Sequence, residues 1–270
     1  MTSARLPGLI VFVAACLLGA PLQVGATAIA SSTLDFNHLA ITPAAGTFSL
    51  DGVWSLEAFA HADNSLGEID EQFTPGNSPG MVSASAAVTW ASANGAARAP
   101  NAPPDLVVAG SASSTVKIPG YGPASASGNG RGTLFNSFTL TGGGPSVSVT
   151  FEIDIWGLID LLTDSFGVFA RSETIFTLAV DGEVVLFDDR PREIGPNSGL
   201  IEPFAERLMN TVTLASVDAD GMPLSHSLIL EADSESRALV IPEPPIALLV
   251  VAGLGALAAA RRRTVRVVAE

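Results

Sequence analysis

The chain is poor in residues on which much protein chemistry depends. Among its 270 residues it has one cysteine, Cys16, one lysine, Lys117, and one tyrosine, Tyr121. Cys16 lies in an N-terminal segment that we expect to be removed, and the remaining chain then has no thiol for a disulfide or a zinc site. The net charge of −14 argues against the basic surface that nucleic-acid phosphates require, so we expect no nucleic-acid partner.

Catalytic motifs are also scarce. The three histidines, His38, His61 and His226, show no metal-ligand spacing, and no His-Glu-x-x-His stretch occurs. We therefore expect these histidines to be surface or half-buried side chains and not ligands. We expect no catalytic residues and a non-enzymatic protein. A secreted hydrolase on a β-sandwich fold is the alternative, because a fold does not dictate function and a catalytic triad is defined by its geometry and not by its order in the sequence.

The N-terminus is typical of a secretory signal peptide. Arg5 precedes an almost uninterrupted apolar run, Leu6 to Leu18, and small residues follow around Ala26 and Ala28. A charged start, a short apolar region and an Ala-x-Ala site are the three parts of such a peptide. We expect residues 1–28 to be cleaved off during export.

Two other interpretations of this segment are weaker. An N-terminal anchor helix is disfavoured because Pro21 and Gly25 break the apolar run. Val13-Ala14-Ala15-Cys16 also resembles a bacterial lipoprotein lipobox. The apolar run continues past Cys16, which favours the signal peptide.

A second apolar run lies near the C-terminus. Residues Ile246 to Ala260 contain no charged or hydrogen-bonding side chain, and Arg261, Arg262 and Arg263 follow. As a helix the run would be ~22 Å long, short for a ~30 Å hydrocarbon core, but the arginines can extend to the far interface. We therefore expect a transmembrane helix at 246–260. By the positive-inside rule, the basic tail at 261–270 is then cytoplasmic and the rest of the chain lies outside.

The segment before this helix, residues 239–245, is rich in proline. Pro242, Pro244 and Pro245 keep Glu243 extended and accessible to a processing enzyme. The Pro-Glu-Pro stretch, the apolar helix and the arginine cluster together resemble the PEP-CTERM sorting signal. This resemblance implies processing by exosortase, a membrane transpeptidase of Gram-negative bacteria that produce exopolysaccharide. The β-rich middle of the chain is similar in layout to other uncharacterised members.

The middle of the chain has the period of β-strands. From Ser146 to Trp156, apolar residues alternate with polar ones, and Asp181-Gly182 separates two β-rich runs as a hairpin turn does. Other expected strands are Thr33–Thr42, Phe48–Ala60, Met81–Trp90, Gly132–Leu140, Thr211–Val217 and Ser225–Glu231. We predict one antiparallel β-sandwich over residues 29–238, of jelly-roll or immunoglobulin-like kind.

Four segments do not show this period clearly. Gly157–Ala170 reads as a short helix or a long crossing loop, and Ile194–Met209 is equally ambiguous. Ala91–Pro104, rich in alanine, asparagine and proline, reads as a long loop. Pro119–Arg131, rich in glycine and serine, reads as a loop or an edge segment.

The candidate ligand-binding residues are few. Asp218 and Asp220 faintly resemble the start of a calcium loop, so a structural Ca²⁺ is the one cofactor we consider. Glu231, Asp233 and Glu235 alternate on one strand face, where water or a cation would relieve their repulsion. For stacking on sugars, Tyr121 is the best candidate and Trp156 a further one, whereas Trp54 and Trp90 fit the core.

Together these features predict an exported surface or extracellular-matrix protein. The resemblance implies exosortase as a partner, and the acidic, hydroxyl-rich composition fits a structural role among exopolysaccharides. The membrane would hold the chain through its C-terminal helix until processing. A simple single-pass membrane protein, with its tail uncut, is the other alternative.

Overall fold

The computed structural model describes residues 27–101, 106–119, 124–164 and 167–241. This part of the chain is mainly β. Its strands are β1 (Ala28–Pro43), β2 (Thr47–Leu50), β3 (Ser55–Asn64), β4 (Ile69–Asn77), β5 (Gly80–Val88), β6 (Ala91–Ala99), β7 (Ala109–Ile118), β8 (Ala124–Thr141), β9 (Ser146–Thr163), β10 (Val168–Val180), β11 (Glu183–Asp189), β12 (Arg192–Ile194), β13 (Ser198–Ala215) and β14 (Ser225–Val240).

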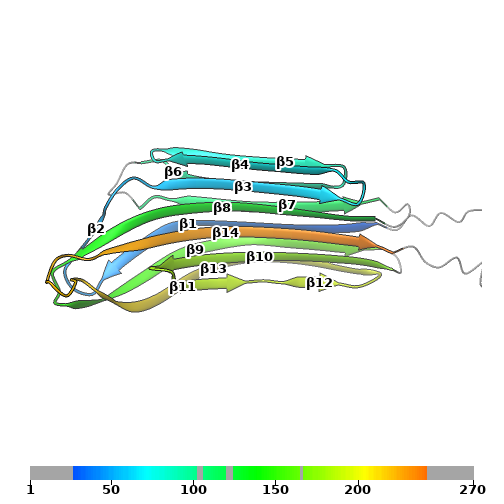
Figure 1. Cartoon of the computed structure of the whole chain (residues 1–270). Coiled ribbons are helices and arrows are strands. Elements are labelled where there is room, and N and C mark those ends of the chain that lie inside the picture. The colour runs from blue at the N-terminus through cyan, green and yellow to red at the C-terminus, as the bar shows by residue number, and fades with distance from the viewer. Residues whose placement is uncertain (1–26, 102–105, 120–123, 165–166, 242–270) are drawn as a thin grey trace, which may run out of the picture. The chain divides into compact units, whose positions relative to one another are not determined.

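The strands form two antiparallel sheets over one shared core (Figure 1). Sheet A has the order β13–β9–β1–β7–β6–β5. Sheet B has the order β11–β10–β14–β8–β3–β4, with β12 beside β10 and β2 beside β8. The longest strands have 18 residues, which corresponds to about 60 Å. The predicted antiparallel, two-layer β architecture is therefore confirmed.

The clearest sequence signals are found where they were predicted. In β9, Val147 and Val149 are buried and Ser148 is exposed, so the period of two separates the core from solvent. Asp181 and Gly182 join β10 to β11 with φ angles of 52° and 82°. A type I′ turn requires positive φ at both central residues, and the predicted hairpin is confirmed.

Two segments of ambiguous prediction are strands. The helix or crossing loop predicted for Gly157–Ala170 is wrong, because β9 continues to Thr163 and β10 begins at Val168. Ile194–Met209 mostly belongs to β13, which pairs with β9 along its whole length. The outward Leu158 and Leu162 of β9 are apolar, so the alternation of apolar and polar residues disappears although the strand continues.

The two predicted loops are strands as well. Most of Ala91–Pro104 is β6, and the second half of Pro119–Arg131 is the start of β8, inside sheet B and not at its edge. In β8 the small residues do have a period of two, because Gly128, Gly130 and Gly132 all face inward. The close approach of the two sheets at this place requires small residues.

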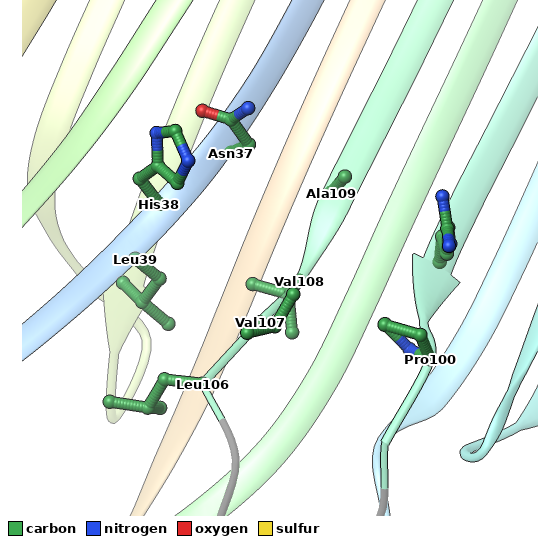
Figure 2. Close-up of a pocket in the computed structure, with 9 residues that line it drawn as sticks. Asn37, His38, Leu39, Pro100, Leu106, Val107, Val108 and Ala109 are labelled. Carbon is green, nitrogen blue, oxygen red and sulfur yellow. The ribbon is translucent and has the colours of Figure 1, made fainter.

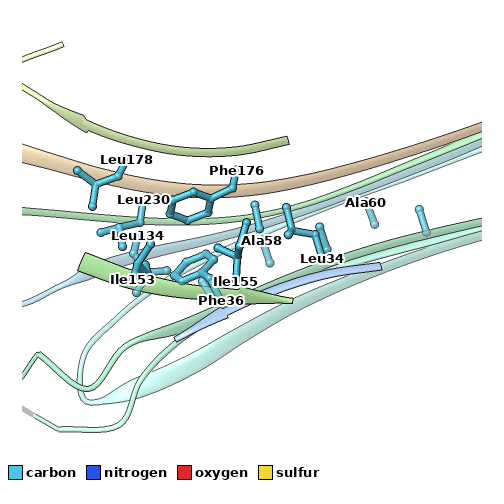
Figure 3. Close-up of a cluster of buried hydrophobic side chains, with 14 of the residues drawn as sticks. Leu34, Phe36, Ala58, Ala60, Leu134, Ile153, Ile155, Phe176, Leu178 and Leu230 are labelled. Carbon is cyan, nitrogen blue, oxygen red and sulfur yellow. The ribbon is translucent and has the colours of Figure 1, made fainter. Parts of the chain in front are cut away.

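The core is thick on one side of the sandwich. Large side chains from both sheets meet there, among them Phe36 and Ile153 from sheet A and Phe176 and Leu230 from sheet B (Figure 3). The rings of Phe36 and Phe176 lie edge to face with their centroids 5.3 Å apart. Burial of such side chains supplies most of the free energy of folding.

The other side of the core is thin. The inward glycines of β8 lie directly against the backbone of β6 and β7 in sheet A. A Cβ atom on Gly130 would lie 2.1 Å from the carbonyl oxygen of Asn94, and one on Gly132 would lie 2.0 Å from that of Ala96. Main chains of opposite sheets therefore touch, and no side chain fits between them.

A buried serine cluster lies between the two sheets. It consists of Ser32 and Ser114 from sheet A and Ser172, Ser234 and Ser236 from sheet B. The hydroxyls bond one another across the layers, with Oγ–Oγ distances of 2.8 Å for Ser32–Ser234 and 2.8 Å for Ser114–Ser236. Because a hydroxyl both donates and accepts, each serine has a hydrogen-bond partner within the cluster.

An arginine links the two sheets along one side of the sandwich, where β11 of sheet B lies near β13 of sheet A. Arg190, just after β11, forms two hydrogen bonds to Asp188 and an ion pair with Glu206 of β13. Its guanidinium also lies 4.3 Å from the ring centroid of Phe204. The edge of sheet B is thus attached to the edge of sheet A by side chains, and not by a strand ladder.

The first and last described residues lie at the same end of the sandwich (Figure 1). The amide of Asp164 donates to the carbonyl of Thr27 at 3.3 Å, and the amide of Ile241 donates to the carbonyl of Gly167 at 2.8 Å. Both ends of the described chain are therefore attached to the turn region between β9 and β10. Within the described ranges, the chain forms no helix long and apolar enough to cross a membrane.

Candidate functional site

The outer surface of sheet A carries an array of small polar side chains. We call it the hydroxyl face; its members are Ser31, Thr33, Ser83, Ser85, Ser92, Asn94, Ser111, Ser113 and Thr115. Paired residues put them in rows, for example Ser85, Asn94, Ser113 and Thr33 on four adjacent strands. Neighbours are about 4.8 Å apart across strands and about 7 Å apart along them, spacings close to the size of a sugar ring.

Trp156 lies at the border of the hydroxyl face. The alternation along β9 turns its indole outward, between Asp35 of β1 and Ala205 of β13, and 37% of the residue is exposed. Burial raises the pKa of the Asp35 carboxyl above its usual range. An exposed indole next to a carboxyl and hydroxyl groups can pack on the apolar face of a sugar and bond its hydroxyls.

The other two tryptophans are less exposed than Trp156. Trp54 is fully buried just before β3, so its predicted core position is confirmed. Trp90 lies in the turn after β5 with a φ of 103° and packs partly against the core. Trp156 therefore offers the largest exposed surface of the three to a ligand.

A charged row follows Trp156 along the same surface. Arg207 of β13 donates two hydrogen bonds to Asp154 and pairs with Glu152 at 2.8 Å. His38 Nδ1 lies 3.0 Å from Asp154 on its other side. The bonds from Arg207 and then from His38 lower the pKa of Asp154 below its usual range, so this carboxylate stays ionised.

His38 lies on a β-bulge beside a cavity. The pairing of β1 with β9 shifts between Asn37 and Ala40, and His38 has a φ of 57°. The cavity, about 470 Å³, is bordered by Asn37, His38, Leu39, Pro100, Leu106 and Val108 (Figure 2). Its lining is largely apolar, and among the described residues no hydroxyl or thiol is bonded to the second ring nitrogen of His38.

The other histidines lie elsewhere. His61 on sheet B lies between Asp63 and Glu71, with nitrogen–oxygen distances of 3.2 and 3.3 Å. His226 is buried, with Nδ1 at 2.6 Å from Asp181 and Nε2 at 2.7 Å from the carbonyl of Ala215. Each histidine is therefore in a separate hydrogen-bond network.

The outer face of sheet B carries the predicted carboxylate row of β14. Asp233 lies between Glu231 and Glu235 on this face. Burial first, and then the charge of Glu231, raise the pKa of Asp233 to about 6. The amide of Asn129 donates to Asp233 at 2.8 Å and Arg131 lies near Glu231, so protein groups provide part of the expected relief of repulsion.

A Gly-x-Ser-x-Gly spacing, that of a nucleophile elbow, occurs at residues 76–80. Its Ser78 is buried between β4 and β5, and its Oγ accepts a hydrogen bond from the Trp54 amide at 2.9 Å. A nucleophile elbow needs a strand–turn–helix context with an exposed serine. The spacing here belongs instead to a strand–turn–strand connection.

The structure places some of the predicted site residues and not others. Asp218 and Asp220 lie in a tight turn, where Asp218 Oδ1 accepts the amides of Asp220 and Met222, both at 2.9 Å. In the described ranges, no group of three or more His, Cys, Asp and Glu side chains could hold a metal ion. Ala28 is the buried first residue of β1.

The remaining predicted residues lie outside the described ranges. They are Ala26, Tyr121, Pro242, Glu243, Pro244, Arg261, Arg262 and Arg263, together with the predicted helix at 246–260. Comparison of the chain with protein-family models and with curated proteins finds no match.

Proposed function

We propose that the chain is an exported surface or matrix protein whose C-terminal segment is a PEP-CTERM sorting signal. In this proposal exosortase recognises Pro242, Glu243 and Pro244 after export and releases the sandwich from its membrane helix. The role of the sandwich is non-enzymatic and associated with exopolysaccharide. We assign the sandwich to the jelly-roll kind, because most connections cross from one sheet to the other.

One observation carries this proposal: the two ends of the described chain meet at one end of an elongated domain. The predicted signal-peptide cleavage falls at Ala28, the first residue of β1, and Ile241 directly precedes Pro242 of the predicted sorting motif. Cutting at both places would remove only Ala28, the partner of Ile118 and Thr163, from the strand ladders, because β14 finishes at Val240. The geometry supports a domain that tolerates loss of both terminal segments.

Sorting is tested by the intact mass of the protein from its native host, with and without exosortase. We expect a released species that starts near Ala28 and finishes near Pro242–Pro244, present in the wild type and missing from the mutant. Full-length tails in the membranes of both strains would contradict sorting and favour a simple single-pass protein. A lipidated N-terminus at Cys16 would point to the lipoprotein alternative.

The hydroxyl face supports the polysaccharide-associated role. It offers rows of hydrogen-bonding groups that belong to rigid strands, and Trp156 at its border offers an apolar platform. Rigid aromatic contacts usually carry much of the free energy of binding at a surface. We therefore expect Trp156 to dominate binding of a polysaccharide chain.

Trp156→Ala is expected to weaken binding to exopolysaccharide purified from the producing strain by roughly tenfold, or ~1.4 kcal/mol. The matched control is Phe187→Ala, which removes an exposed aromatic ring from β11 in sheet B. Binding is measured by co-sedimentation, and folding by circular dichroism. Equal binding by both variants would remove the hydroxyl face from the proposal.

A further inference from the structure

The two ends of the sandwich differ in chemistry. The terminal end is the one where β1 begins and β14 finishes, and the distal end is opposite (Figure 1). Turns at the distal end carry Asp51, Asp181, Glu183, Asp218 and Asp220. The terminal end also carries carboxylates, Glu68 and Asp164, and in addition it has exposed apolar side chains, which we call the apolar collar: Leu66, Leu162, Phe169, Leu239 and Ile241.

The collar surrounds the terminal end on both outer faces. Phe169 and Leu239 are direct partners on the outer face of sheet B, and Leu162 lies opposite Ile29 on that of sheet A. The collar residues of β9, β10 and β14 lie within two residues of the end of their strand ladders, or about 7 Å. Each collar residue exposes 37% or more of its surface.

Basic side chains lie directly behind the collar. Lys117 is opposite Ile29 on sheet A, and Arg171 is opposite Arg237 on sheet B. The two arginines keep carboxylate partners on their own strands. They also line a surface cavity of about 580 Å³ together with Phe169, Leu239 and the carboxylates of Asp63 and Glu193. An apolar rim backed by cationic groups is the arrangement that proteins place at a membrane interface.

We propose that the terminal end docks on the surface of a phospholipid bilayer, with the apolar collar among the lipid headgroups. This inference rests on the proposed function, because it requires the predicted helix at 246–260 to span that bilayer. Four residues then separate Ile241 from the helix, so the Cα atoms of Ile241 and Ile246 are at most ~18 Å apart. Since a headgroup region is roughly 5–7 Å thick, the collar cannot remain far from the lipid.

Docking sets the orientation of the unprocessed protein. The long axis stands away from the membrane, so the acidic distal end points away from anionic headgroups. The hydroxyl face and Trp156 run along the side of the sandwich, about 20 Å or more from the terminal end for Trp156, and stay open to a polysaccharide. Processing then frees the collar from the bilayer together with the domain.

The test uses the full chain with Cys16→Ser, reconstituted into phosphatidylcholine vesicles with and without phosphatidylglycerol. Phe169→Cys and Leu239→Cys report on the collar, and Met222→Cys is the matched control, an exposed apolar side chain at the distal end. Each cysteine receives a bimane fluorophore, and nitroxide-labelled headgroups serve as quencher. We expect several-fold stronger quenching at positions 169 and 239 than at 222.

The outcomes separate this inference from the proposed function. Protein that floats with the vesicles but is equally quenched at all three positions keeps the anchor and overturns docking. Protein that does not float overturns the anchor, and docking with it. A third outcome is that the collar labels are shielded from water but not quenched, and that the chain crosslinks to dimers. The collar would then contact a second copy of the chain, which would contradict docking on lipid.

Discussion

Gly130→Ala is expected to destabilise the sandwich by roughly 3 kcal/mol or more, a large part of the stability of a typical domain. The added Cβ would lie 2.1 Å from the Asn94 carbonyl oxygen and 2.6 Å from that of Ser113. Both atoms belong to the main chain of the opposite sheet, which cannot rotate away as a side chain can. The two sheets must therefore move apart, and contacts along β6, β7 and β8 are lost.

Substitutions of two further glycines give an expected order of stability that tests this prediction. A Cβ on Gly128 would lie 2.9 Å from the Ser92 carbonyl oxygen, so Gly128→Ala should cost less than Gly130→Ala. A Cβ on Gly199 would find ordinary contacts at 3.5 Å or more, and Gly199→Ala should be neutral or slightly stabilising. Urea unfolding of the three variants gives the order. If Gly130→Ala resembles Gly199→Ala, the sheets are not in main-chain contact; if it gives no folded protein, Gly128→Ala still tests the order.

This thin side of the core is where sequence-based prediction fails, for a physical reason. Glycine and alanine have low strand propensity, so the segments that form β6 and the start of β8 read as loops. Main-chain contact between the sheets selects those residues and overrides propensity. The signal that identifies both strands is the period itself: Gly128, Gly130 and Gly132 alternate as strictly as the valines of β9.

The candidate site is predictable in part. The alternation that buries Ile155 necessarily turns Trp156 outward, so the exposed indole follows from the sequence. The hydroxyl face cannot be predicted from the sequence, because its rows combine residues of β5, β6, β7 and β1, and the sequence of β6 is typical of a loop. The apolar collar also escapes prediction, since Leu162, Phe169 and Leu239 come together only through the pairing of distant strands.

Asp233→Asn is expected to stabilise the protein at neutral pH by up to about 3 kcal/mol and to have little effect near pH 4. Its pKa rises from 3.8 to about 6 on folding, chiefly through burial and then through the charge of Glu231. The folded state therefore binds the proton more tightly than the unfolded state. Stability falls as the pH increases from about 4 to about 6, and above that range the full cost of ionising Asp233 is present.

Asparagine retains the oxygen that accepts the hydrogen bond of Asn129 but carries no charge, so it removes this cost without breaking the contact. The control, Glu57→Gln, removes one carboxylate from β3, two strands away from β14 on the same face, and accounts for the change in net charge. Unfolding is measured at about pH 4 and about pH 7.5 for each variant. If Asp233→Asn stabilises the protein equally at both pH values, folding does not raise the pKa of Asp233. A stabilisation confined to the higher pH would show that the ionised Asp233 of the half-buried carboxylate row of β14 lowers the stability of the sandwich at neutral pH.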